Sequence, residues 1–291
     1  MTRLAGKLLA LAALAGALAV TRTALALEPG PQVLEDAEHA EFPGGNLRVR
    51  AERQGDEVRL DVTNGYRMPV TTDFAFATTN LKSAHAPHTL TIPAGGHRRV
   101  ATFRLVNKDR PINYSYVMNW MFGDPGAAPA DTVYDLPYAP GEGFRVLQGY
   151  FGAFSHHDVA AIDWAMPEGT PIRAAREGVV TAYNDTAVGS GLDPEYMALE
   201  KANWVIVEHD DHTLGCYFHL MPHGIKVSTN TRVLRGQLLG FSGNTGFSSR
   251  PHLHFEVRTP IDGTRYRTYP VRFRLRSGDD IPLAGGLYTA P

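Results

Sequence analysis

Hydrophobic and polar residues alternate along much of the N-terminal half of the chain. In residues 46–65, two alternating runs flank a Gln-Gly-Asp turn, and residues 88–93 and 99–106 repeat the pattern around a Gly-Gly turn. A period of two puts every second side chain on the same face of a strand, so these segments predict β-hairpins. We therefore expect residues 27–135 to form an immunoglobulin-like β-sandwich domain.

The pattern changes after this region, where Pro, Gly, Ala and Asp become frequent. We expect residues 136–147 to be a linker. A second β-rich stretch, with short apolar runs separated by glycine turns, predicts another β domain at residues 148–275, followed by a C-terminal extension at 276–291. The totals of 29 Gly and 20 Pro agree with many turns and with an all-β fold class.

Residues 1–26 differ again. Arg3 and Lys7 precede an apolar run of thirteen residues, and Ala24 and Ala26 place small side chains where a signal peptidase cleaves. This leader predicts a secretory signal peptide. The alternative, a membrane anchor, requires about 20 apolar residues. We expect an exported protein, periplasmic or secreted, with no stable membrane span once the leader is removed.

The charge and the cysteine content of the chain argue against nucleic-acid binding and against a disulfide-stabilised fold. The leader carries three basic residues and no acid, so its removal changes the formal net charge from −2 to −5. A mildly acidic chain without a basic face is not expected to bind nucleic acid. The single cysteine, Cys216, excludes an intramolecular disulfide and lies in an apolar run, which predicts a buried core thiol. The sequence does not specify an oligomeric state.

Histidine is concentrated in the C-terminal half, where eight of the twelve lie between residues 156 and 254. Three patterns there have metal-binding or acid–base character: His156-His157 with Asp163, His219 at the end of an apolar run, and His252 with His254 in an alternating strand. His252 and His254 share one face of that strand, so both imidazoles can reach the same small volume.

A zinc site accounts for these residues. Catalytic Zn²⁺ takes three protein ligands and a water, which one histidine from the first pattern, Asp163 and one histidine from the third could supply. The remaining histidine of the third pattern and His219 would then be free for acid–base work. The alternative is a pair of surface-facing histidines.

The stretch from about residue 148 to 258 resembles the lysostaphin-type zinc endopeptidases, the family called M23. The resemblance rests on the order and spacing of Ser155-His156, AIDWAMPEGTP (161–171), REGVV (176–180), NWVIVEH (203–209), YFHL (217–220), GQLLG (236–240), SGNTG (242–246) and PHLHFE (251–256). It implies a β core with biotinyl-carrier-like topology. It says little about the N-terminal half.

The resemblance also implies roles for individual residues. The Zn²⁺ ligands would be His156, Asp163 and His254, and the two catalytic histidines beside the metal would be His219 and His252. His157 remains an alternative to His156, because it is closer to Asp163 in sequence. Tyr150 would steady the tetrahedral intermediate, as a tyrosine does in some members of the family.

Two further residues of this region stand out. Arg250 departs from the family pattern, which has a small residue there, and it either lines the substrate cleft or lies in a solvated turn. Glu256 is two residues after His254 and therefore shares its face of the strand. Its carboxylate could then hydrogen-bond the ring nitrogen of His254 that does not bind the metal.

The function implied is that of an exported zinc metallo-endopeptidase that hydrolyses cross-links between peptidoglycan peptide stems. One alternative is a non-enzymatic relative that binds the wall and regulates other hydrolases. Such relatives typically lose metal ligands, whereas every candidate ligand is present here. The other alternative is a zinc protease that acts on proteins, which would share the same metal centre.

Overall fold

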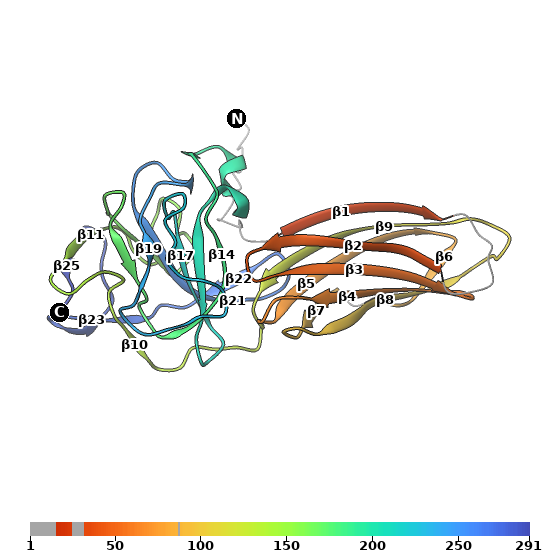
Figure 1. Cartoon of the computed structure of the whole chain (residues 1–291), viewed down its shortest axis with the longest axis horizontal. Helices are drawn as coiled ribbons and strands as arrows, with labels where there is room; N and C mark the ends of the chain where they lie inside the picture. Colours follow the sequence, from red (N-terminus) through yellow and green to blue (C-terminus); the bar gives the residue numbers. More distant parts are fainter. Residues whose placement is uncertain (1–15, 25–31, 87) are drawn as a thin grey trace, which may run out of the picture.

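The computed structural model describes residues 16–24, 32–86 and 88–291. Within these ranges the chain forms β-strands and two short 3-10 helices, without an α-helix, which confirms the predicted all-β class. An elongated N-terminal sandwich lies beside a C-terminal body of shorter strands (Figure 1). Among the described residues, no helix has the length and apolar character needed to cross a membrane.

The sandwich consists of two antiparallel sheets. The first has the strand order β1-β9-β5-β7, with bounds β1 (Gly16–Ala24), β5 (Val70–Thr79), β7 (Thr89–Ile92) and β9 (Ile112–Phe122). The second has the order β2-β3-β4-β8-β6, with bounds β2 (Gln32–Phe42), β3 (Gly45–Gln54), β4 (Glu57–Asn64), β6 (Leu81–His85) and β8 (His97–Leu105). Buried residues of both sheets, Val49 and Tyr116 among them, form one hydrophobic core. The immunoglobulin-like order of connections stays a prediction.

The predicted hairpin at residues 46–65 is confirmed as β3 and β4. Gln54 pairs with Glu57, so the turn has two residues, and Gly55 adopts a φ of +58° there. Glycine reaches this left-handed region without the steric cost of a Cβ. The alternation of the sequence appears as buried and exposed faces, with Val49 and Val62 opposite each other in the core.

Strand β1 lies inside the predicted leader. It pairs antiparallel with β9 from Gly16 opposite Trp120 to Ala24 opposite Ile112. The rest of the predicted signal peptide lies outside the described residues. Cleavage after Ala26 would remove β1 and leave β9 at the edge of its sheet.

The C-terminal body is built on a nine-stranded sheet of order β18-β14-β16-β17-β21-β12-β11-β25, with β22 paired to β21. Its strands are β11 (Gly143–Gln148), β12 (Ala161–Trp164), β14 (Gly178–Asn184), β16 (Trp204–Glu208), β17 (Leu214–Phe218), β18 (Arg232–Val233), β21 (Leu253–Pro260), β22 (Tyr266–Thr268) and β25 (Leu287–Thr289). Around it lie β10 (Val133–Tyr134), β13 (Pro171–Arg173), β15 (Ser190–Gly191), β19 (Leu238–Phe241), β20 (Gly246–Phe247), β23 (Arg272–Leu275), β24 (Gly278–Asp280) and the 3-10 helices η1 (Pro194–Met197) and η2 (Leu199–Lys201). The biotinyl-carrier-like topology stays a prediction.

The segments expected to be a linker and a C-terminal extension are part of this body. Strand β11 begins at Gly143, inside the predicted linker 136–147, and pairs with β25 of the predicted extension 276–291. Phe144 and Val146 alternate with Arg145 in β11, a strand pattern that the neighbouring Pro and Gly residues obscured. The division of the chain into two domains remains our proposal, with both segments assigned to the second.

The sandwich and the C-terminal body share a hydrophobic core. Trp204 and Phe218 face the sandwich, and Trp204 contacts Phe42 and Phe122 with ring centroids 5.3 and 6.3 Å apart. The alternate residues of the same strands, such as Val205, pack into a second core inside the body. Strands β16 and β17 are therefore apolar on both faces, because both faces are covered.

Candidate active site

Three neighbouring strands bring two candidate metal ligands, Asp163 and His254, close to His219. Asp163 on β12 pairs directly with His254 on β21, and His254 also lies opposite Phe218, the last residue of β17. Side chains directly opposite one another on an antiparallel pair lie about 5 Å apart at Cβ. The pairing register thus places the carboxylate and the imidazole side by side, with His219 next to them.

His156, Asp163 and His254 converge with their ligand atoms within 4.8 Å of one another. His254 Nδ1 lies 3.0 Å from Asp163 Oδ1, and His156 Nε2 lies 3.3 Å from both His254 Nδ1 and Asp163 Oδ2. All three side chains are buried. Two imidazole nitrogens and one carboxylate oxygen at this spacing fit a zinc site with three protein ligands. His157, the alternative to His156, is exposed.

The charges of this cluster depend on one another. Burial alone would raise the pKa of Asp163, but hydrogen bonds from His156 and His254 hold it well below its usual value. Burial opposes a charge on His254, yet hydrogen bonds to Asp163 and Glu256 raise its pKa to about 9. A metal ligand must be deprotonated, so a metal ion competes with a proton for His254.

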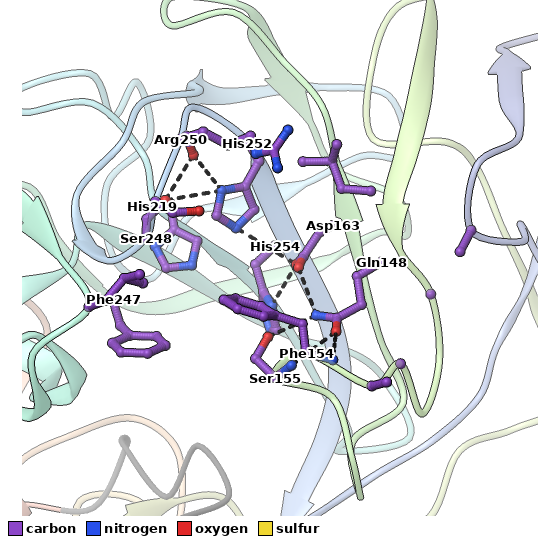
Figure 2. Close-up of a pocket in the computed structure, with 17 residues that line it drawn as sticks. Gln148, Phe154, Ser155, Asp163, His219, Phe247, Ser248, Arg250, His252 and His254 are labelled. Atoms are coloured by element: carbon purple, nitrogen blue, oxygen red, sulfur yellow. Dashed lines mark hydrogen bonds and ion pairs between the residues drawn. The ribbon is translucent and has the colours of Figure 1, made fainter.

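His219 and His252 lie beside the cluster of His156, Asp163 and His254, with ring centroids 4.5 Å apart (Figure 2). The Nδ1 of His219 is 2.7 Å from the Thr245 carbonyl oxygen, and the Nδ1 of His252 is 2.8 Å from that of Arg250. A carbonyl only accepts, so both rings carry a proton on Nδ1 and leave Nε2 free to accept one. Burial lowers the pKa of both rings and keeps them neutral.

A glutamine anchors the loop that carries His156. The Gln148 amide nitrogen donates to Ser155 Oγ at 2.8 Å and to Asp163 Oδ2 at 3.2 Å. Its carbonyl oxygen accepts the backbone N–H groups of Phe154 and Ser155 at 2.9 and 3.0 Å. One buried amide therefore joins the loop to Asp163, a candidate metal ligand (Figure 2).

Tyr150 does not lie with the other predicted residues. Its hydroxyl donates to the Val271 carbonyl oxygen at 2.9 Å and accepts the Val271 N–H at 3.1 Å. Tyr150 is absent from the described residues that line the cavity beside Asp163 and His254, and burial raises its pKa. The role expected for Tyr150 at the intermediate stays a prediction, and it would require this pair of bonds to open.

A cavity of about 520 Å³ opens over the cluster. Asp163, His219, His252 and His254 form its base, and its walls include the apolar side chains Leu147, Phe154, Leu192 and Phe247. Every described residue that lines it belongs to the C-terminal body. The sandwich packs behind the sheet and does not form the cavity.

Two supporting residues were not singled out from the sequence. Gln148 precedes the histidine pattern by eight residues, and Ser248 lies between the SGNTG and PHLHFE motifs. Ser248 Oγ is 3.2 Å from His252 Nδ1 and 2.8 Å from the Arg250 carbonyl oxygen. Neither residue type is distinctive, so only the position close to a motif could have drawn attention to them.

Comparison with known proteins agrees with the motif analysis. Residues 157–267 match the model of Peptidase family M23, which confirms the predicted resemblance for this part of the chain. The chain is 36% identical over 117 residues to the glycyl-glycine endopeptidase ALE-1 of Staphylococcus capitis, a match that covers 40% of this chain and 29% of that protein. It is 35% identical over 95 residues to the peptidoglycan DD-endopeptidase ShyA of Vibrio cholerae, covering 33% and 19%. The chain thus spans less than a third of these relatives.

Solved structures give a weaker likeness. The catalytic domain of lysostaphin from Staphylococcus simulans is 25% identical, with a TM-score of 0.31 over 45% of this chain and 88% of that one. A putative M23 peptidase from Pseudomonas aeruginosa is 18% identical, with a TM-score of 0.32 over 82% and 87%. TM-scores this low add nothing to the fold described above.

Proposed function

We propose, from the match of residues 157–267 to peptidase family M23, that this chain is an exported zinc metallo-endopeptidase that cleaves peptide cross-links in peptidoglycan. The observation that carries the proposal is the convergence of His156, Asp163 and His254 beside two histidines whose protons lie on Nδ1, with His252 Nε2 3.8 Å from Asp163 Oδ1. Two of the proposed ligands, Asp163 and His254, thus line the same cavity as the two proposed acid–base groups. The names of ALE-1 and ShyA support the choice of cell-wall peptides as substrate.

The chemistry divides between the metal and the protein. Zinc, held by the three ligands, would lower the pKa of a water and polarise the scissile carbonyl. His219 and His252 are neutral at pH 7 with Nε2 unprotonated, so either ring can accept the proton of the attacking water at Nε2 and then deliver that same proton to the leaving amine. Backbone carbonyls fix both rings at Nδ1, which keeps the two Nε2 atoms oriented.

The residues of the cavity walls would position the substrate and shield it from water. The Gln148 bonds hold the loop of Phe154 and Ser155 against Asp163, so one wall is fixed relative to the metal. The apolar side chains exclude water from the peptide around the scissile bond. The predicted leader would deliver the enzyme to the compartment where peptidoglycan lies.

The test has a metal arm and a substrate arm. We expect purified protein to retain one zinc ion, His156→Ala to lose it and His157→Ala to keep it, measured by elemental analysis after gel filtration. Sacculi incubated with the zinc protein should lose cross-linked muropeptide dimers and gain monomers by mass spectrometry, whereas His219→Ala should change neither. Unchanged dimers in the presence of bound zinc would overturn the proposal.

A further inference from the structure

Arg250 occupies the cavity wall immediately beside the proposed catalytic histidines (Figure 2). Its carbonyl oxygen holds His252 Nδ1 at 2.8 Å and lies 2.8 Å from Ser248 Oγ. Residue 250 is therefore fixed relative to the reacting centre, although its own side chain is exposed to solvent.

The guanidinium of Arg250 has no acidic partner in the described part of the chain. Several other arginines of the C-terminal body do pair with acids, as Arg176 does with Asp211 at 2.6 Å and Arg258 with Glu256 at 3.0 Å. No described residue forms a hydrogen bond or ion pair with the Arg250 guanidinium. Its charge is thus available to a bound molecule.

Arg250 is also the one lysine or arginine among the described residues that line the cavity. The single carboxylate there, Asp163, is engaged by His156 and His254 and is a proposed metal ligand. An arginine presents a planar fork of donors that matches a carboxylate in a bidentate manner.

We propose that Arg250 binds a carboxylate of the substrate and selects peptides that carry a free carboxylate near the scissile bond over neutral peptides such as oligoglycine. This inference rests on the proposed function and specifies its substrate class. The carboxylate accepts hydrogen bonds from the guanidinium while the neighbouring peptide bond lies over the metal cluster. Arg250 is thus a specificity residue and takes no part in proton transfer.

The experiment compares a cross-linked muropeptide dimer with the same dimer after its carboxylates are converted to amides. Equilibrium binding is measured by titration calorimetry on zinc-loaded His219→Ala protein, alone and combined with Arg250→Gln, Arg250→Lys or Arg276→Gln. Arg276 is a matched control, because it is an exposed arginine outside the cavity. Hydrolysis of both dimers by proteins with an intact His219 is followed in parallel.

We expect amidation to weaken binding by about tenfold or more, the size of a charge-assisted hydrogen bond. Arg250→Gln should abolish the difference, Arg250→Lys should retain part of it, and Arg276→Gln should leave it unchanged. Equal binding of both dimers to His219→Ala protein, or a preference that survives Arg250→Gln, would overturn the assignment of Arg250. Absence of hydrolysis by the intact zinc protein would instead overturn the proposed peptidase function, whatever the binding preference.

Discussion

His254 Nε2 lies 3.4 Å from Glu256 Oε2, on the side of the ring opposite the Nδ1 atom that faces Asp163. The other oxygen of Glu256 accepts a hydrogen bond from Arg258 at 3.0 Å, and the Arg258 guanidinium lies 4.8 Å from the centre of the Tyr266 ring. Alternate positions of β21 share a face, so residues 254, 256 and 258 form one buried row. A carboxylate behind a metal-binding imidazole fixes its tautomer and orientation.

Glu256→Gln should weaken zinc binding by about ten- to a hundredfold, the usual effect of losing such a supporting carboxylate. The neutral amide still fills the space but holds the Nε2–H of His254 less strongly. Competition with a chromogenic chelator measures the zinc dissociation constant. Glu168→Gln, at an exposed position, is the matched control and should bind zinc like the unsubstituted protein.

A second variant of residues 256 and 258 separates a loss of zinc affinity from a loss of stability. Loss of Glu256 leaves the buried Arg258 without its partner, which costs stability. The double variant Glu256→Gln with Arg258→Met removes both charges and should recover thermal stability without recovering zinc affinity. If the double variant binds zinc normally, the carboxylate does not support His254.

Gln148→Ala should loosen the loop that carries His156. Four hydrogen bonds of the amide would be lost, leaving the N–H groups of Phe154 and Ser155 without their acceptor. We expect a loss of about 1–3 kcal/mol in the free energy of unfolding together with weaker zinc binding. Urea unfolding and chelator competition measure the two effects. An exposed turn variant, Gln54→Ala, should leave zinc affinity unchanged; equal affinities for all three proteins would contradict the anchoring role of Gln148.

The Asp211 carboxylate should stabilise the folded protein at neutral pH and lose this effect in acid. Although burial would raise its pKa, hydrogen bonds from Thr213, Ala130 and Arg176 hold it well below the ordinary value of about 3.9. A lowered folded-state pKa stabilises the protein above the unfolded-state value, and the contribution is lost as pH falls through the folded-state pKa. Asp211→Asn should therefore be less stable than the unsubstituted protein at pH 7, and the gap should shrink below about pH 4. Thermal unfolding of both proteins at several pH values measures this difference in stability. A difference that does not change with pH would show that the Asp211 carboxylate is not its cause.

The sequence was sufficient for features that have a strong local pattern. Alternation predicted the β3–β4 hairpin, because a period of two fixes the face of each side chain. The residue patterns predicted a site made of Asp163 and two histidines, and the family resemblance implied His156 and His254, which lie together with Asp163 in the structure.

Contacts between residues far apart in the sequence could not be predicted from the sequence. Pairing of β11 with β25 joins segments more than 130 residues apart, and nothing in the Pro- and Gly-rich stretch before β11 signals its partner. Tyr150 illustrates the same limit, since its spacing from His156 says nothing of Val271, which binds its hydroxyl. Long-range contacts of this kind are decided by packing, which a single sequence does not display.

The packing of Trp204 predicts that the two halves of the chain unfold together. Trp204 is fully buried, its Nε1 donates to the Leu199 carbonyl oxygen at 3.0 Å, and its ring contacts Phe42 and Phe122 of the sandwich. Trp204→Ala should cost about 3–5 kcal/mol through the cavity it creates. Because the core is continuous across the contact, far-UV signal and zinc release should shift together in a single denaturant transition. Two separate transitions, with zinc release unaffected by the substitution, would mean that the sandwich does not stabilise the sheet that carries the proposed zinc ligands.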